Sequence, residues 1–199
     1  MAQTKSVTKV QTLVESAIMV ALATVLSMIP LIPEMPLGGK VTLLSMLPIC
    51  FISIRHGLKW GLGSAFVYSV IQLMLSIAKI MTWGLTPVIL LGCIFLDYLV
   101  PFTLIGLAGV FRKKGTAGMF LGIVLALSLR FLSHFISGVV LWTNVEQFAL
   151  FGRSWENRPV LYSLLYNGCY MLPEIVLTSV GAWLLTRIPT VRKLILPQN

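Results

Sequence analysis

Two ionisable side chains, Arg130 and His134, lie one helical turn apart in the otherwise almost wholly apolar stretch 122–142. An ionised side chain at the depth of the bilayer core costs about 2.5–3.5 kcal/mol on insertion scales, so such residues persist where they face a cavity or a partner. Ser137 and Gly138 share the helical face of Arg130 and His134. This face therefore predicts a small polar pocket inside a helical bundle.

Asp97 is a candidate partner from another apolar segment, about 11 residues from its start and roughly 16 Å along its axis. Pro101 follows four residues later and has no N–H to donate to the carbonyl of Asp97. One helical turn thus offers a ligand both a carboxylate and a free carbonyl oxygen. The structural alternative is a salt bridge between Asp97 and Arg130, which leaves His134 to contact a ligand.

The last apolar segment presents a third polar face, because Asn167, Tyr170 and Glu174 follow the i, i+3, i+7 spacing of a helix. Pro173 frees the carbonyl of Cys169 in the same helix. We therefore expect this helix to contribute hydrogen-bonding groups to the pocket.

Asp97, His134, Trp142 and Asn167 are expected to meet in the outer half of the bundle, from three helices. Carboxylate, imidazole and carboxamide groups recognise donors and acceptors on a small heterocycle. An aromatic face attracts a cation by about 2 kcal/mol when desolvated. A cationic aromatic vitamin fits this chemistry, although spacing alone does not identify it.

Signatures of catalysis are missing from the sequence. There is no G-x-x-x-x-G-K-[ST], H-E-x-x-H or G-x-S-x-G motif and no spaced set of metal ligands. We therefore expect no enzyme activity, no metal and no cofactor in this chain.

The elements that position these residues are membrane helices, because the 199 residues are 57% hydrophobic and 11% charged, with a mean hydropathy of +0.94. All apolar runs but the second reach the roughly 18–20 residues needed to cross the bilayer core. The second is short and contains Pro48, so it tilts, breaks or only partly spans. The sequence predicts an all-α bundle of six transmembrane helices in one domain, 1–199. The runs are 13–32, 42–54, 60–78, 86–111, 117–142 and 160–186.

Basic residues fix the orientation, because cytoplasmic loops carry the excess of Lys and Arg. A cytoplasmic N-terminus and C-terminus put ten of them inside and only Lys40, Lys79, Arg153 and Arg158 outside. The net charge of +9 then reflects topology and anionic lipid headgroups, not nucleic acid. The inner set is Lys5, Lys9, Arg55, Lys59, Arg112, Lys113, Lys114, Arg187, Arg192 and Lys193.

Three outer loops connect the predicted helices: the irregular, Pro- and Gly-rich loop 30–40, the brief turn 79–86 and the long loop 143–159. We expect loops 30–40 and 143–159, or the turn 79–86, to close over a ligand. On the first helix, Ala17, Ala21 and nearby Ala23 form a small-residue surface that lets another helix approach closely.

Four stretches, in order along nearly the whole chain, resemble the thiamine-specific substrate-binding components (S-components) of energy-coupling factor (ECF) transporters. They are GGKVTLLSMLPICFISIRHGLKWG (38–61), LDYLVPFTLIGLAGVFRKKG (96–115), RFLSHFISGVVLW (130–142) and LYSLLYNGCYMLPE (161–174). The resemblance implies a multi-pass protein of a bacterial cell membrane that captures thiamine outside. It also implies docking on a transmembrane coupling protein and two ATPase subunits, which hydrolyse the ATP.

The resemblance also assigns residues. It implies thiamine contacts at Asp97 with Tyr98, at His134 with Trp142, and at Tyr162 with Asn167. The acid and histidine would bind the aminopyrimidine, and aromatic rings would cover the thiazolium. Tyr162 rests on the resemblance alone, because helical spacing favours Tyr166 or Tyr170. The family's A-x-x-x-A docking surface is matched by Ala17 and Ala21.

Departures from the family pattern leave other ligands open. Some members have glutamate at the position of Asp97 and a tryptophan where Gly38–Gly39 stands, and loop 143–159 is long. The same architecture binding hydroxymethylpyrimidine or another vitamin is one alternative. A proton-coupled secondary transporter that uses Asp97 and Glu174 as proton carriers is another, and an intramembrane enzyme is disfavoured by the missing motifs.

Overall fold

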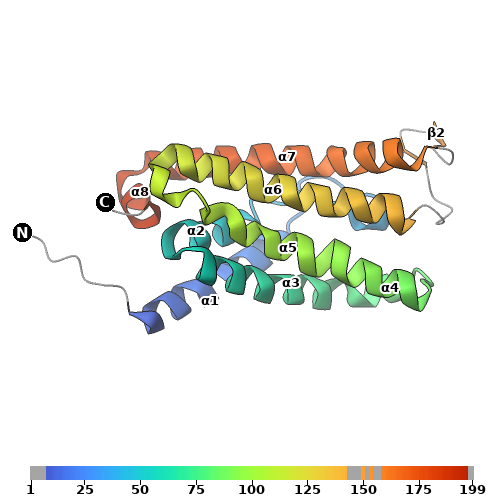
Figure 1. The fold of residues 1–199 in the computed structure, drawn as a ribbon, viewed down its shortest axis with the longest axis horizontal. Helices are drawn as coiled ribbons and strands as arrows, with labels where there is room; N and C mark the ends of the chain where they lie inside the picture. Colours follow the sequence, from blue (N-terminus) through green and yellow to red (C-terminus); the bar gives the residue numbers. More distant parts are fainter. Residues whose placement is uncertain (1–7, 143–148, 151–152, 155–157, 197–199) are drawn as a thin grey trace, which may run out of the picture.

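Long helices run side by side along one axis in the computed structural model, which describes residues 8–142, 149–150, 153–154 and 158–196 (Figure 1). The N-terminal half contains α1 (Lys9–Ser27), the short 3-10 turn η1 (Pro36–Gly38), α2 (Leu47–His56) and α3 (Leu58–Met81). A continuous helical path follows through α4 (Pro87–Cys93), η2 (Ile94–Leu99), α5 (Val100–Leu104) and η3 (Ile105–Gly109). After a turn at 110–111, the short η4 (Arg112–Lys114) leads into the next long helix. The C-terminal half contains α6 (Gly115–Val140), an antiparallel pair of two-residue strands, β1 (Ala149–Leu150) and β2 (Arg153–Ser154), and then α7 (Pro159–Arg187) and α8 (Pro189–Ile195).

Five helical segments of the described chain are long and apolar enough to cross a membrane: Lys9–Ser27, Leu58–Met81, Pro87–Gly109, Arg112–Val140 and Pro159–Arg187. These confirm five of the six predicted membrane helices and the all-α membrane fold. The sixth is not confirmed, because the ten residues of α2 cover only about 15 Å of a roughly 30 Å core.

The short helix α2 is the centre of the bundle. Every residue from Leu47 to Ile54 is buried, and Ile49, Cys50 and Ile54 are fully enclosed. Pro48 sits in its first turn, where a missing N–H costs nothing. Gly57, with φ +92°, turns the chain directly into α3, a backbone conformation that suits glycine. The apolar second segment is therefore protein core and faces little lipid.

The helix that carries Asp97 widens at that residue. Ile94–Leu99 forms a π-helix, and Pro101 lies just beyond it in α5. Proline cannot supply the N–H that the carbonyl of residue 97 would receive in an α-helix, so the turn loosens there. The hydrogen bond from residue 101 to the Asp97 carbonyl is absent, as the sequence predicted, and the wider π-turn follows from its absence.

The first outer loop is ordered and turns back on itself. Pro30 and Thr42 form an antiparallel bridge, the Leu31 N–H donates to the Val41 carbonyl (2.8 Å), and the Met35 N–H donates to the Gly39 carbonyl (2.7 Å). Apart from this single bridge and the short turn η1, residues 30–40 have no regular secondary structure, as predicted. We call residues 31–46 the entry strap.

Both ends of the described chain lie at the same end of the bundle, together with α8 and the α2–α3 turn (Figure 1). The residues predicted to be cytoplasmic lie in these elements, in η4 and at the end of α7, apart from Lys5, which is outside the described residues. The grouping agrees with the predicted topology; the side of the membrane itself stays a prediction.

Candidate functional site

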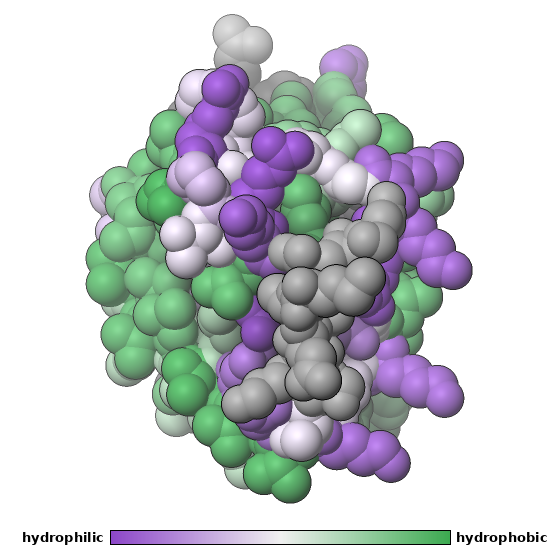
Figure 2. Space-filling view, turned by 90° about the vertical axis from the view of Figure 1, so that its left-hand side faces the viewer, coloured by the Kyte–Doolittle hydropathy of each residue, from purple (hydrophilic) through white to green (hydrophobic). Residues whose placement is uncertain are grey.

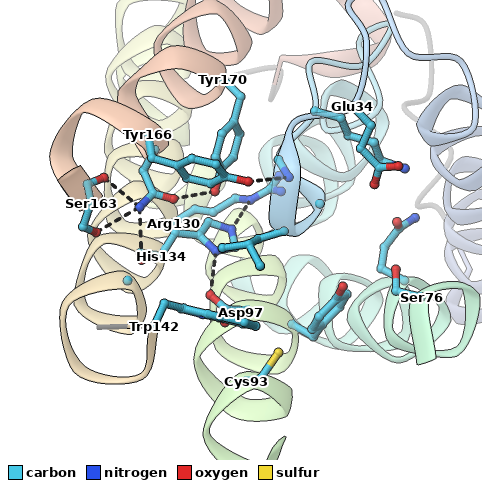
Figure 3. A pocket seen from close by; sticks show the side chains of 18 of the residues that line it. Glu34, Ser76, Cys93, Asp97, Arg130, His134, Trp142, Ser163, Tyr166 and Tyr170 are labelled. Atoms are coloured by element: carbon cyan, nitrogen blue, oxygen red, sulfur yellow. Dashed lines mark hydrogen bonds and ion pairs between the residues drawn. The ribbon is translucent and has the colours of Figure 1, made fainter. Parts of the chain in front are cut away.

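The carboxylate of Asp97 is the centre of a hydrogen-bonded cluster between the π-turn and α6 (Figure 3). One oxygen accepts from Ser137 Oγ (2.7 Å) and Trp142 Nε1 (3.0 Å), and the other accepts from His134 Nδ1 (3.3 Å). Its side chain is 16% exposed, so it stays within reach of the cavity beside it. A carboxylate with three donors around it is held in one orientation.

His134 links Asp97 to Arg130. The Arg130 Nε–H can only donate, so His134 Nε2 accepts from it (3.4 Å). The imidazole proton then lies on Nδ1, where it is donated to Asp97. The arrangement sets the tautomer of His134 and points the ring edge along the cavity wall.

The alternative of a direct salt bridge between Arg130 and Asp97 is wrong in this structure. Arg130 Nη1 donates to the Met46 sulfur (2.8 Å), and its guanidinium lies 4.1 Å from the centre of the Phe102 ring. Arg130 lies one turn deeper in α6 than His134, so it meets the entry strap and the ring of Phe102 instead of the carboxylate. The cation is held by an aromatic face and a soft sulfur.

Helix α7 supplies the opposite wall. Tyr170 Oη donates to Asn167 Oδ1 (2.7 Å), and Asn167 Nδ2 donates to the His134 carbonyl (3.3 Å) and to Ser163 (2.9 Å to its carbonyl). The Tyr162 ring stacks on that of Tyr166, with centroids 5.8 Å apart. The carboxamide of Asn167 thus joins α6 to α7, and the tyrosines give that wall an aromatic surface.

The entry strap closes the cavity from the third side. Tyr166 Oη accepts the Gly39 N–H (3.1 Å) and donates to the Pro36 carbonyl. At the outer edge, Glu34 pairs with Lys79 at the end of α3 (2.9 Å). These bonds fasten a loop segment to two helices that are far apart in the sequence.

The resulting cavity, which we call the central cavity, is bounded by charged and aromatic side chains (Figure 3). Asp97, Glu34, Arg130, Lys79 and His134 line it. Seven aromatic residues line it as well: Trp83, Tyr98, Phe102, Trp142, Tyr162, Tyr166 and Tyr170. Such a space suits a flat ring system with positive charge, since aromatic faces and a carboxylate both attract a cation.

All six residues predicted to contact the ligand line the central cavity: Asp97, Tyr98, His134, Trp142, Tyr162 and Asn167. Tyr166 and Tyr170, favoured by spacing, line it too. The structure brings these side chains together, and their contact with a ligand stays a prediction.

Several of the lining residues were not predicted. Among them, Glu34, Lys79 and Trp83 come from the two shorter outer loops and the adjoining helix end, and Cys93 lies one turn before Asp97. Trp83 packs edge-on against Trp142, with centroids 5.5 Å apart. A tryptophan in the predicted outer turn 79–86 is the sequence signal that could have identified Trp83.

The long loop 143–159, expected to close over the ligand, lies mostly outside the described residues.

Glu174 does not line the central cavity. It is fully buried beneath it, where Oε1 accepts from the Thr42 N–H (2.6 Å) and from the Thr42 hydroxyl (2.7 Å). In the described part of the chain, no group of three or more His, Cys, Asp or Glu is placed to hold a metal ion.

The predicted docking residues Ala17 and Ala21 are exposed on α1. Ala23 is fully buried, so it faces the bundle and its inclusion in the same surface is wrong. A partner helix therefore has two small residues to approach, spaced one turn apart.

Known proteins similar to this chain share one description. The family model described as thiamine transporter protein (Thia_YuaJ) matches residues 13–193. The thiamine transporter ThiT of Bacillus subtilis is 34% identical over 191 residues, covering 87% of this chain and 88% of that protein. The thiamine transporter ThiT of Lacticaseibacillus paracasei is 30% identical over 187 residues, covering 84% and 83%.

The fold has a solved counterpart in ThiT from Listeria monocytogenes, with a TM-score of 0.69 over 92% of this chain and 98% of that one. The two sequences are 23% identical, so this likeness concerns the fold. Both curated relatives are named as transporters, which agrees with the expectation that the chain is not an enzyme.

Proposed function

This chain belongs to the thiamine transporter protein family and is a multi-pass membrane protein, and we propose that it binds thiamine in the central cavity as the S-component of an ECF-type importer. The observation that carries the proposal is the Asp97 carboxylate, held by three donors at the edge of a cavity with seven aromatic side chains. Thiamine offers complementary groups: a cationic thiazolium for the rings and an aminopyrimidine for the carboxylate.

Binding at the pyrimidine end uses Asp97 and His134 together. The carboxylate accepts from the exocyclic amine, and the histidine, fixed by Arg130 and Asp97, keeps the acceptor geometry rigid. The carboxamide of Asn167 offers the pyrimidine a further hydrogen-bonding group once its bonds to Ser163 and Tyr170 rearrange. The thiazolium then lies among the tyrosine and tryptophan rings, where a desolvated cation gains about 2 kcal/mol per good face.

Entry of the ligand requires the entry strap to move, since Gly39 and Pro36 are bonded to Tyr166 at the cavity wall. Reclosure of the strap excludes water from the bound cation.

Transport itself is assigned to a complex. The exposed Ala17 and Ala21 offer the surface for a transmembrane coupling protein, and two ATPase subunits supply the hydrolysis. The chain needs no cofactor of its own for this role.

The test is a titration of intrinsic tryptophan fluorescence with thiamine in the purified, detergent-solubilised chain. We expect saturable quenching at low ligand concentration and a smaller signal in Trp142→Phe, because Trp142 is in the cavity wall. Trp60→Phe is the matched control, since this residue lies in α3 and does not line the cavity. A response to hydroxymethylpyrimidine and none to thiamine would replace the ligand and keep the site. No response to either compound would refute the proposal.

A further inference from the structure

Helix α3 forms a further side of the central cavity, opposite the side chains to which ligand contacts are assigned. Gln72, Ser76 and Lys79 all line the cavity, and their i, i+4, i+7 spacing puts them on one face of the helix. We call this face the polar face of α3. Ser76 and Glu34 lie on the opposite side of the cavity from His134 (Figure 3). The central cavity therefore has two polar walls that face each other.

The depth of Gln72 in the bundle is unusual for a polar side chain. Helix α3 begins at the end of the molecule seen in Figure 2, where hydrophilic side chains gather between hydrophobic flanks. Gln72 lies roughly 21 Å along the helix from that end and roughly 14 Å from the other. The opposite face of α3 exposes Val67 and Met74. Polar side chains persist this far inside a spanning helix when they face a cavity or a partner.

The orientation of the Gln72 carboxamide follows from its bond to α1. Gln72 Nε2 donates to Ser27 Oγ (2.8 Å). The Ser27 hydroxyl has a single hydrogen, which it donates to the Thr24 carbonyl (2.7 Å), so the group that faces Ser27 is the NH₂ and not the oxygen. Turning the amide around would place two acceptors against each other. The NH₂ is thus held on the side of α1.

The oxygen of the same carboxamide is left as an acceptor. Gln72 is only 5% exposed, and within the described residues its Oε1 accepts no hydrogen bond. Oε1 is not one of the enclosed, unbonded oxygens of the chain, so it is accessible from the cavity that Gln72 lines. A ligand in the cavity therefore meets an acceptor of fixed orientation.

The other two residues of the polar face select a ligand group less well. Lys79 is already paired with Glu34 (2.9 Å), and an ammonium would repel a cationic ring. Ser76 is half-buried between Gln72 and Lys79, and a hydroxyl accepts as readily as it donates. Only the carboxamide oxygen of Gln72 requires a donor from the ligand.

We propose that Gln72 is a specificity-determining residue, whose Oε1 accepts a hydrogen bond from the hydroxyl of the hydroxyethyl arm of thiamine. The inference rests on the proposed function, because with the exocyclic amine on Asp97 the hydroxyl is the remaining donor, at the other end of the ligand. A ligand with no donor at that end leaves a buried acceptor unpaired, so it binds less tightly.

The experiment compares thiamine with its analogue that has an ethyl arm in place of the hydroxyethyl arm, by titration calorimetry on the purified full-length chain. Gln72→Leu removes the acceptor, and Gln72→Glu keeps an acceptor oxygen at the same position. Ser69→Ala is the matched control, because Ser69 is buried on the same helix, donates to the Phe66 carbonyl (2.7 Å) and does not line the cavity. Thermal unfolding shows which variants are folded.

We expect the original chain to bind thiamine about five-fold more tightly than the analogue, the value of one ordinary hydrogen bond. In Gln72→Leu this preference should disappear, whereas Gln72→Glu and Ser69→Ala should keep it. Three results would each overturn the role of Gln72 and leave the proposed function standing: thiamine binding with no preference in the original chain, a preference that survives in folded Gln72→Leu, or one that is lost in folded Gln72→Glu. An original chain that binds neither ligand would overturn both.

Discussion

Replacing Asp97 by asparagine tests the centre of the proposed site, because the two side chains have the same shape and differ in charge and hydrogen bonding. In the structure all three neighbours, Ser137, Trp142 and His134, act as donors to the carboxylate. Asparagine keeps one acceptor oxygen and presents an NH₂ in place of the other. Whichever way the amide turns, a donor then faces a donor, and the negative charge is lost.

The expected magnitude follows from the contact that the carboxylate would make with the ligand. A hydrogen bond to a charged group contributes about 1.5–3 kcal/mol, which corresponds to a roughly 10- to 150-fold increase in the Kd for thiamine. Ser137→Ala is the matched control, because it removes one donor to the same carboxylate and leaves the charge. Its effect should be about five-fold, the value of an ordinary hydrogen bond.

The assay is titration calorimetry or tryptophan quenching on both variants, with thermal unfolding to show that each is folded. Asp97→Glu restores the charge and should recover most of the affinity lost in Asp97→Asn. A folded Asp97→Asn chain that binds thiamine as tightly as the original would refute the role given to this carboxylate. An effect no larger than that of Ser137→Ala would show that geometry, and not charge, is what Asp97 supplies.

Three further predictions concern the same proposal. His134→Ala should raise the Kd for thiamine at least about ten-fold in the same titration, because it removes a ring that bonds Asp97 and lines the cavity; unchanged affinity would exclude it from the site. Gly39→Ala should speed thiamine release up to about ten-fold in a stopped-flow assay, since the new Cβ would lie 2.8 Å from the Tyr170 ring and push the strap outward. Gly63→Ala, with open space around it, is the control and should change nothing. Ala17→Trp with Ala21→Trp should leave the Kd unchanged and abolish uptake in cells; surviving uptake would show that the partner docks elsewhere.

The polar residues of the site were predictable from the sequence because they lie within long helices. A helix of known period puts Arg130, His134 and Ser137 on one face whatever the rest of the chain does. Depth was predictable too, since Asp97, His134 and Asn167 are similar distances from the ends of their helices. The structure accordingly brings His134 within 3.3 Å of Asp97, and Asn167 within 3.3 Å of the His134 carbonyl.

Helical spacing was a poorer guide for aromatic residues. Tyr162 lies five residues before Asn167 and points well away from it around the helix, yet both line the cavity. A tyrosine side chain is long, and Tyr162 stacks on Tyr166, which carries its ring toward the cavity. Helical spacing predicts the direction of the Cα–Cβ bond. It does not predict the position of a large aromatic ring, which depends on the side chains packed against it.

The entry strap was the least predictable part, because its position depends on contacts that no local pattern encodes. Thr42 meets Glu174 near the middle of α7, so the strap enters the bundle to about half the membrane depth. Non-helical backbone is tolerated there only if its polar groups are bonded within the protein. Glu174 accepts the Thr42 N–H, and Tyr166 accepts the Gly39 N–H.

This requirement explains two features that looked separate in the sequence. The second apolar segment yields a helix of only ten residues because the strap occupies the other half of the depth. Glu174, a candidate proton carrier in the sequence, is committed to the strap through both the backbone and the hydroxyl of Thr42. A carboxylate that gave up its charge to carry a proton would weaken the bonds that hold the strap in the bundle. The position of Glu174 therefore favours a binding protein with an anchored strap over a proton-coupled carrier.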